Sequence, residues 1–198
     1  MTDDAPKTFE LLFDFVSPTA YLAWFRAKGV VARTGARMRP VPVFLGGIMQ
    51  ATGNRPPGTV AAKGRWMRAD LEMWARTFDI PLGRNEHFPV NTLAILRGAV
   101  GLLSDPRFDA YCDACFRGVW LDGRDMARPE EIAAATSQVI APDELMALAQ
   151  NPANKTALKA NTDDAVARGV FGAPSLFVGE TLFFGQDRLD WVEKALTA

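Results

Sequence analysis

The hydroxyl group of Ser17 stands where a strand pattern passes directly into a helix pattern. An aromatic-rich segment alternating at period two precedes Ser17-Pro18, and helical apolar spacing starts at Tyr21. Serine is a favoured N-cap and proline a favoured first helical residue, so the pair is expected to begin a helix. A hydroxyl at the positive end of a helix dipole can also donate to a thiolate and stabilise its ionised form. The two interpretations are compatible.

A proline also stands at the start of a predicted strand near the carboxyl end. In the run Gly172-Ala173-Pro174-Ser175, Pro174 lacks the N–H that a strand ladder uses, so the backbone there is either irregular or paired with something external. A cis Ala173–Pro174 bond would supply such an irregularity, whereas an ordinary trans proline entering a strand is the commoner case. The local sequence leaves both open.

The chain contains one Cys-x-x-Cys pair, Cys112 and Cys115, but its context does not suit thiol redox chemistry. The pair falls inside a helical pattern from Pro106 to Trp120, whereas the redox motif belongs at the mouth of a helix just after a strand. At positions i and i+3 the thiols share one helical face, as core cysteines do. The single histidine, His87, lies in a polar stretch and is expected at the surface, so no Ser-His-Asp arrangement is predicted.

The elements around these residues follow from hydrophobic periodicity. Phe9, Leu11, Phe13 and Phe15 alternate as in a buried strand, and the helix that follows is expected to end at about Thr34, before a glycine. Residues 37–44 predict a second strand, kept short or peripheral by two prolines that donate no ladder hydrogen bond.

A glycine- and proline-rich stretch from residue 46 introduces about a hundred residues of helical pattern. The clearest helix places Met67, Leu71, Trp74 and Phe78 on one face. Strand patterns return at 175–178 and 181–184, joined by a Gly-Glu turn of the type II′ kind, and a last helix is expected from 187 to 196. Further helices are predicted at 92–103, 106–120, 129–138, 143–150 and 152–168.

Composition excludes several classes of function. The chain has 198 residues, 48% of them hydrophobic, with a net charge of −1 and no long run of like charges, so nucleic acid and anionic membranes are not expected as partners. The longest apolar stretch, 93–103, is about half the length of a membrane span. Two cysteines and one histidine cannot form a zinc site, and no metal is predicted. The acidic start of the chain is unlike a signal peptide, so a cytoplasmic protein is expected.

Several motifs occur together in the order seen in one family. The chain resembles the 2-hydroxychromene-2-carboxylate isomerases and the related kappa-class glutathione transferases over nearly its whole length. The resemblance implies an α/β thioredoxin-like fold with a large all-helical insertion, which agrees with the element order above, and it sets the thioredoxin-like domain at 1–45 and 169–198 and the helical insertion at 46–168. The motifs are FDFVSPTAY at 13–21, GGIM at 46–49, GNRPP at 53–57, KG at 63–64, FGAP at 171–174 and FGQDRL at 184–189.

The resemblance also implies roles for individual residues. Ser17 matches the catalytic serine that binds the sulfur of glutathione, and it replaces the first cysteine of the Cys-Pro-x-Cys motif of related oxidoreductases, with Ala20 at the second. The implied glutathione contacts are Asn54 and Lys63 for the tripeptide's backbone and carboxylate, Ala173 before the cis-proline Pro174 for the cysteinyl unit, and Gln186 and Asp187 for the γ-glutamyl end.

The function implied is a glutathione-dependent isomerase that interconverts 2-hydroxychromene-2-carboxylate and trans-o-hydroxybenzylidenepyruvate in the breakdown of naphthalene-type aromatics. Its partners would be a small aromatic carboxylate and, as a homodimer, a second copy of the chain; Arg97 and Arg124 are candidates for holding the substrate carboxylate. Two alternatives remain: a kappa-like transferase that conjugates electrophiles, and a thioredoxin-fold peptide-binding module without chemistry.

Overall fold

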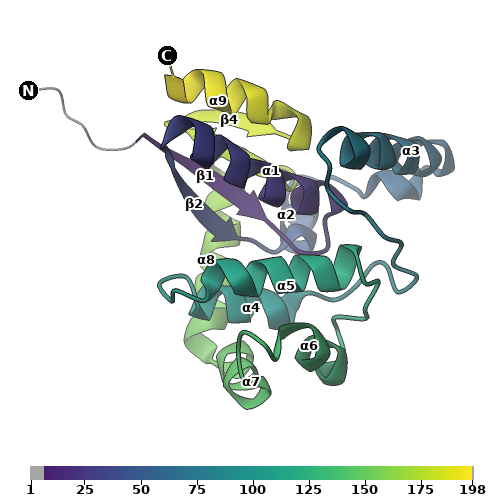
Figure 1. The fold of residues 1–198 in the computed structure, drawn as a ribbon, viewed down its shortest axis with the longest axis vertical. Coiled ribbons are helices and arrows are strands. Elements are labelled where there is room, and N and C mark those ends of the chain that lie inside the picture. The colour runs from purple at the N-terminus through teal and green to yellow at the C-terminus, as the bar shows by residue number, and fades with distance from the viewer. Residues whose placement is uncertain (1–6, 198) are drawn as a thin grey trace, which may run out of the picture.

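Four strands form a mixed sheet at the centre of the fold (Figure 1). A computed structural model describes residues 7–197; residues 1–6 and 198, at the ends of the predicted thioredoxin-like domain, lie outside the described range. The strand order is β2-β1-β3-β4, with β1 parallel to β2 and the other two pairs antiparallel. The strands are β1 (Thr8–Phe13), β2 (Arg37–Pro42), β3 (Ser175–Val178) and β4 (Thr181–Phe184).

Side chains from both faces of β1 are buried. Phe9, Leu11 and Phe13 join the larger core with helices α1 and α9, while Leu12 points into a smaller core with residues of α2 and α8. The sheet therefore lies between two helical layers, the arrangement expected for a thioredoxin-like α/β fold. β2 lies at an edge of the sheet, as its prolines predicted, because an edge strand needs fewer ladder donors.

The helical elements agree with the predicted order. They are α1 (Pro18–Thr34), α2 (Leu45–Thr52), α3 (Ala61–Thr77), α4 (Leu93–Gly101), α5 (Phe108–Trp120), α6 (Pro129–Thr136), α7 (Pro142–Gln150), α8 (Pro152–Ala167) and α9 (Leu189–Thr197), with single 3-10 turns at Pro57–Thr59 and Gln186–Arg188. The sequence pattern did not show α2, because a single apolar turn lies within its glycine-rich segment.

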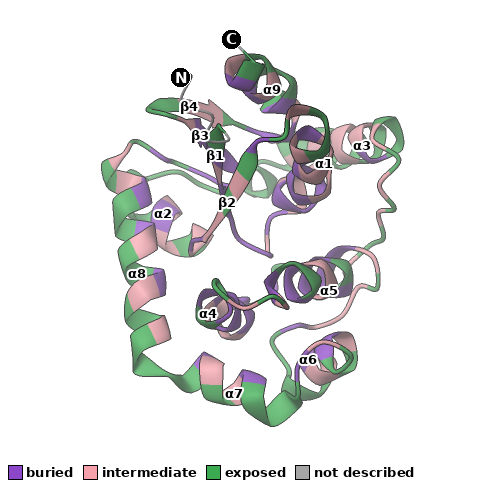
Figure 2. Ribbon diagram, turned by 60° about the vertical axis from the view of Figure 1, so that its left-hand side comes forward, coloured by how far each residue is buried: buried purple, intermediate pink, exposed green. Residues whose placement is uncertain are grey.

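The helices between β2 and β3 are distributed unevenly around the sheet. Helices α4 to α7 lie together below it, α3 stands beside α1, and α8 runs back to the sheet past α2 (Figures 1 and 2). Most residues of α4 and α5 are buried, whereas α8 keeps one exposed face (Figure 2). The domain boundaries at 45/46 and 168/169 remain a prediction. No helix within residues 7–197 is long and apolar enough to cross a membrane.

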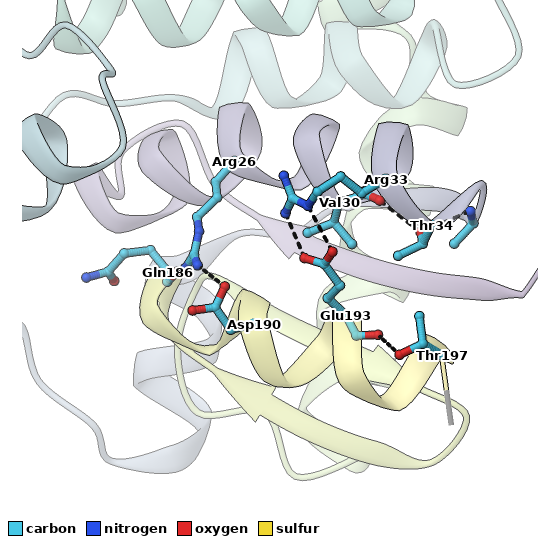
Figure 3. A network of polar contacts seen from close by, with 9 residues as sticks. Arg26, Val30, Arg33, Thr34, Gln186, Asp190, Glu193 and Thr197 are labelled. Carbon is cyan, nitrogen blue, oxygen red and sulfur yellow. Dashed lines mark hydrogen bonds and ion pairs between the residues drawn. The ribbon is translucent and has the colours of Figure 1, made fainter.

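Helix α1 is fixed by charged and polar contacts to the carboxyl-terminal helix. The Arg33 guanidinium donates two hydrogen bonds to the Glu193 carboxylate, at 2.8 and 2.7 Å, and Arg26 pairs with Asp190 (Figure 3). Arg26 also donates to the backbone oxygen of Gln186 at 2.9 Å. These contacts hold the turn before α9 against α1, the helix that begins at Ser17.

Gly35 ends α1 in a conformation that suits glycine. Its φ is 68°, in the left-handed region, and its N–H donates to the Val31 carbonyl at 2.9 Å. We expect Gly35→Ala to lower the free energy of unfolding by about 1 kcal/mol, because a Cβ is strained at this φ although no atom would clash with it. Gly58, which has open space and no positive φ, is the matched control. Denaturant unfolding that shows equal effects of Gly35→Ala and Gly58→Ala would contradict this account.

Candidate functional site

The Ser17 hydroxyl lies at the amino end of α1 and faces the segment before β3. Its Oγ accepts a hydrogen bond from the Ala20 N–H at 3.2 Å, which makes it the N-cap, and donates to the Ala173 carbonyl oxygen at 2.8 Å. The peptide bond between Ala173 and Pro174 is cis. The two motifs singled out in the sequence, 156 residues apart, therefore meet at one point.

Thr19 adds a second hydroxyl group that the sequence analysis passed over. Its Oγ1 lies 3.0 Å from Ser17 Oγ and 3.4 Å from the Ala173 carbonyl oxygen. Thr19 is half-buried, while Ser17 is only 3% exposed. While Ser17 donates to Ala173, Thr19 is the more accessible donor at this end of the dipole. The available signal was a second hydroxyl residue two positions after a serine N-cap.

A buried carboxylate supports the turn that carries Ser17. Asp14 Oδ1 accepts from the Val16 N–H at 3.0 Å and from the Thr92 hydroxyl at 2.6 Å, and Oδ2 accepts from the Leu45 N–H at 2.9 Å. Burial raises the pKa of Asp14 above its ordinary value, while these three donors oppose the shift. One side chain thus joins the Ser17 turn to the beginnings of α2 and α4.

A large cavity opens in front of Ser17. Its volume is about 1370 Å³, and its wall includes Ser17, Thr19, Asn54, Ala173 and Trp120. The Trp120 indole N–H donates to the Phe15 carbonyl at 2.8 Å, which fixes the end of α5 beside the Ser17 turn. A pocket of this size has room for a small-molecule ligand.

Charged side chains on the cavity wall are mostly cationic. Four arginines face two acidic residues, Glu72 and Asp79, although the whole chain carries a net charge of −1. The cavity therefore favours anionic ligands. The arginines are Arg55, Arg68, Arg76 and Arg84.

The other predicted glutathione contacts are only partly gathered at the cavity. Asn54 lies on its wall, where its side-chain amide donates to the Phe171 carbonyl at 2.7 Å. Lys63 is exposed in the first turn of α3, beside Gly64 of the cavity wall. Gln186 is 5% exposed, and its backbone oxygen accepts a hydrogen bond from Arg26.

Asp187 lies next to the segment that contains the cis bond. The Gly185 N–H donates to the Pro174 carbonyl oxygen at 3.1 Å, which holds the turn carrying Asp187 beside the cis peptide, and Arg188 lies 3.5 Å from the Asp187 carboxylate. The pKa of Asp70 on α3 is raised mainly by burial and also by the negative charge of Asp187. The negative charge of Asp187 therefore acts on α3 as well as on its own turn.

The two cysteines do not line the Ser17 cavity. Cys112 and Cys115 are fully buried in α5, and burial raises the pKa of both thiols. They occupy the core, as predicted, away from Ser17.

Neither Arg97 nor Arg124 lies on the wall of the Ser17 cavity, so the suggestion that they hold the substrate carboxylate there is wrong. Arg124 instead pairs with Glu131 at 3.0 Å.

The strand order, the cis-proline facing the amino end of α1 and the inserted helices together define a thioredoxin-fold protein. Residues 8–197 match the family model of the DSBA-like thioredoxin domain, and the chain belongs to that family.

Individual relatives define the branch of the family more closely. The chain is 31% identical over 195 residues to a 2-hydroxychromene-2-carboxylate isomerase of Sphingobium xenophagum, with 96% of this chain and 98% of the relative covered. It is 28% identical over 204 residues to glutathione S-transferase kappa 1 of Homo sapiens, covering 93% and 88%. A solved structure of a 2-hydroxychromene-2-carboxylate isomerase superposes with a TM-score of 0.85 at 25% identity, covering 96% and 94%. The resemblance found in the sequence is confirmed.

We expect Asp14→Ala to lower the free energy of unfolding by about 3 kcal/mol. The substitution leaves the partly buried Val16 and Leu45 N–H groups without their acceptor, and each buried donor so orphaned costs about 1–3 kcal/mol. Asp163→Ala, which removes an exposed carboxylate paired with Lys159, serves as the control and should cost far less. Chemical denaturation measures both. A loss no greater than that of Asp163→Ala would show that Asp14 does not hold the turn.

Proposed function

We propose that this protein is a glutathione-dependent isomerase that interconverts 2-hydroxychromene-2-carboxylate and trans-o-hydroxybenzylidenepyruvate. The observation that carries the proposal is the Ser17 hydroxyl at the amino end of α1, 2.8 Å from the Ala173 carbonyl, on the wall of a cationic cavity. The chain is also 31% identical to an isomerase of that name. A homodimer and a cytoplasmic location remain part of the proposal.

The residues around Ser17 fit a thiol tripeptide. Within residues 7–197 the Ala173 N–H makes no hydrogen bond, so it is free to pair with the backbone of a peptide-like ligand. Asp187 remains our candidate for the ammonium group of a γ-glutamyl unit, since it lies on the turn held beside the cis peptide. Lys63 and Asn54 remain our candidates for the remaining carboxylate and backbone groups.

Glutathione bound here would supply a nucleophilic thiol, which the protein itself lacks at an accessible position. The protein's part is to keep that sulfur ionised. Donation by Ser17 or Thr19 and the positive end of the α1 dipole all favour the thiolate. To donate to sulfur, Ser17 must give up its 2.8 Å hydrogen bond to the Ala173 carbonyl. Thr19 gives up only a longer one, at 3.4 Å to the same carbonyl.

The cavity also suits the second partner. A bicyclic aromatic carboxylate carries one negative charge and a flat apolar body, and the wall offers arginines together with Trp120, Met67 and Leu71. The cationic wall attracts the carboxylate, and the apolar surface excludes water from the reacting carbons. A thioredoxin-fold peptide binder needs neither feature.

Ser17→Ala should reduce kcat/KM with glutathione by roughly 100-fold, as removal of one donor to a developing anion does. The variant should remain folded, because loss of an N-cap costs about 1 kcal/mol. Ser137→Ala, an exposed serine at the end of α6, should leave turnover unchanged. Turnover of the Ser17 variant at the wild-type rate, with folding verified by circular dichroism, would remove Ser17 from the mechanism.

The identity of the reaction is tested by its consumption of glutathione. Purified protein is mixed with 2-hydroxychromene-2-carboxylate and a catalytic amount of glutathione, and the absorbance of the open-chain pyruvate is followed together with the mass of every product. We expect the isomer to form without a conjugate, at a rate that falls when glutathione is omitted. A conjugate formed in proportion to the glutathione consumed would support the kappa-like transferase instead. The similarity to the human kappa transferase is the reason to keep that alternative. No product of either kind would leave the peptide-binding alternative.

A further inference from the structure

A second cavity lies on the other side of the wall that closes the first. Its volume is about 770 Å³, and it is bounded by α2, α4 and α8. Phe44 and Leu93 line both cavities, so a single layer of side chains separates them. Most of its lining is apolar, formed by Phe44, Leu93, Leu158, Val166, Ala51 and Ala167.

Three cationic side chains interrupt this apolar wall. Arg97 comes from α4, and Lys155 and Lys159 come from α8. The only acidic residue on the wall, Asp163, is engaged by Lys159 at 2.5 Å. The positive charges of Arg97 and Lys155 are left without a carboxylate partner within residues 7–197.

Arg97 is the less usual of the two, because part of its guanidinium is buried. Its Nε has no hydrogen-bond partner, and its one hydrogen bond runs from Nη1 to the Ala149 carbonyl at 3.5 Å, the long limit for such a bond. The Nε of Arg124 also lacks a hydrogen bond, but that guanidinium has Glu131 at 3.0 Å and Asp122 at 3.6 Å. The Arg97 side chain is half-buried, and its Nε is shielded from water without a hydrogen-bond partner, which is costly, so an anion beside the guanidinium would be favourable.

We propose that this cavity is a second binding site, for a small apolar carboxylate whose anionic group pairs with Arg97 and Lys155 and whose body packs against Phe44 and Leu158. A planar carboxylate matches the fork of N–H donors of a guanidinium. A monoanion with an apolar body fits better than a phosphate or polyanion, since two free cations stand in a mainly apolar wall. The site is distinct from the Ser17 cavity, and its existence does not depend on the proposed reaction.

The test uses 2-naphthoate as the probe and amide NMR as the site-resolved readout. Backbone amides of Ala51, Gln50 and Ala167 report the second cavity, because these residues line it and not the first; Gly172 and Thr19 report the Ser17 cavity. We expect saturable shifts at the first set. Neutral 2-naphthalenemethanol should bind at the second cavity with a dissociation constant at least roughly tenfold higher, because it lacks the charge-assisted hydrogen bonds.

Arg97→Gln should raise the dissociation constant of 2-naphthoate at the second cavity by roughly tenfold or more and leave the Gly172 shifts unchanged. Lys155→Gln, at an exposed position, should weaken binding in the same direction and covers the case in which the Arg97 variant fails to fold. Arg37→Gln, at an exposed arginine of β2 that lines neither cavity, is the control.

Shifts confined to the Ser17 cavity, or second-cavity binding that neither variant weakens, would overturn the proposal. Failure of the isomerase assay would leave these NMR outcomes untouched, so the two proposals stand or fall separately.

Discussion

The carboxylate of Asp14 is the contact on which the geometry of the site depends. It is buried, it follows β1 directly, and its three donors come from the Ser17 turn, the start of α2 and the residue before α4. These segments form the near wall of the cavity, and no other described side chain joins all three. The raised pKa shows that burial of this charge is costly. The fold retains it because removal would leave backbone donors without acceptors at the point where the helix of Ser17 begins.

A second constraint comes from the hydrogen bonds of the cis Ala173–Pro174 segment, which precedes β3. The carbonyls of Ala173 and Pro174 accept hydrogen bonds from Ser17 and from Gly185, respectively, so the cis peptide is tied both to the mouth of α1 and to the turn before α9. Arg26 then holds that turn against α1 through the Gln186 carbonyl (Figure 3). Serine at position 17 uses both parts of its hydroxyl group: the lone pairs accept from the Ala20 N–H, and the hydrogen is donated to the Ala173 carbonyl.

Local patterns were sufficient for the elements but not for the polar contacts between them. Alternation at Phe9 and Leu11, the prolines of β2 and the glycine at 35 are short-range signals, and the strand, the edge position and the helix end that they predicted are all present. Asp14 and Thr19 went unnoticed because their partners lie up to 154 residues away. For the same reason the sequence could not show that Arg97 lines a separate cavity rather than the one in front of Ser17.

The distribution of charge connects the two cavities. A chain with net charge −1 places four arginines against two acidic residues on one cavity wall and three cations against one carboxylate on the other, so its excess of negative charge lies elsewhere. Such segregation concentrates anions near the molecule's openings and weakens as salt is added. Because Phe44 and Leu93 belong to both walls, a ligand in either cavity packs against the same two side chains. The backbone N–H of Phe44 donates to the Thr162 hydroxyl at 3.0 Å, so this shared wall is connected to α8.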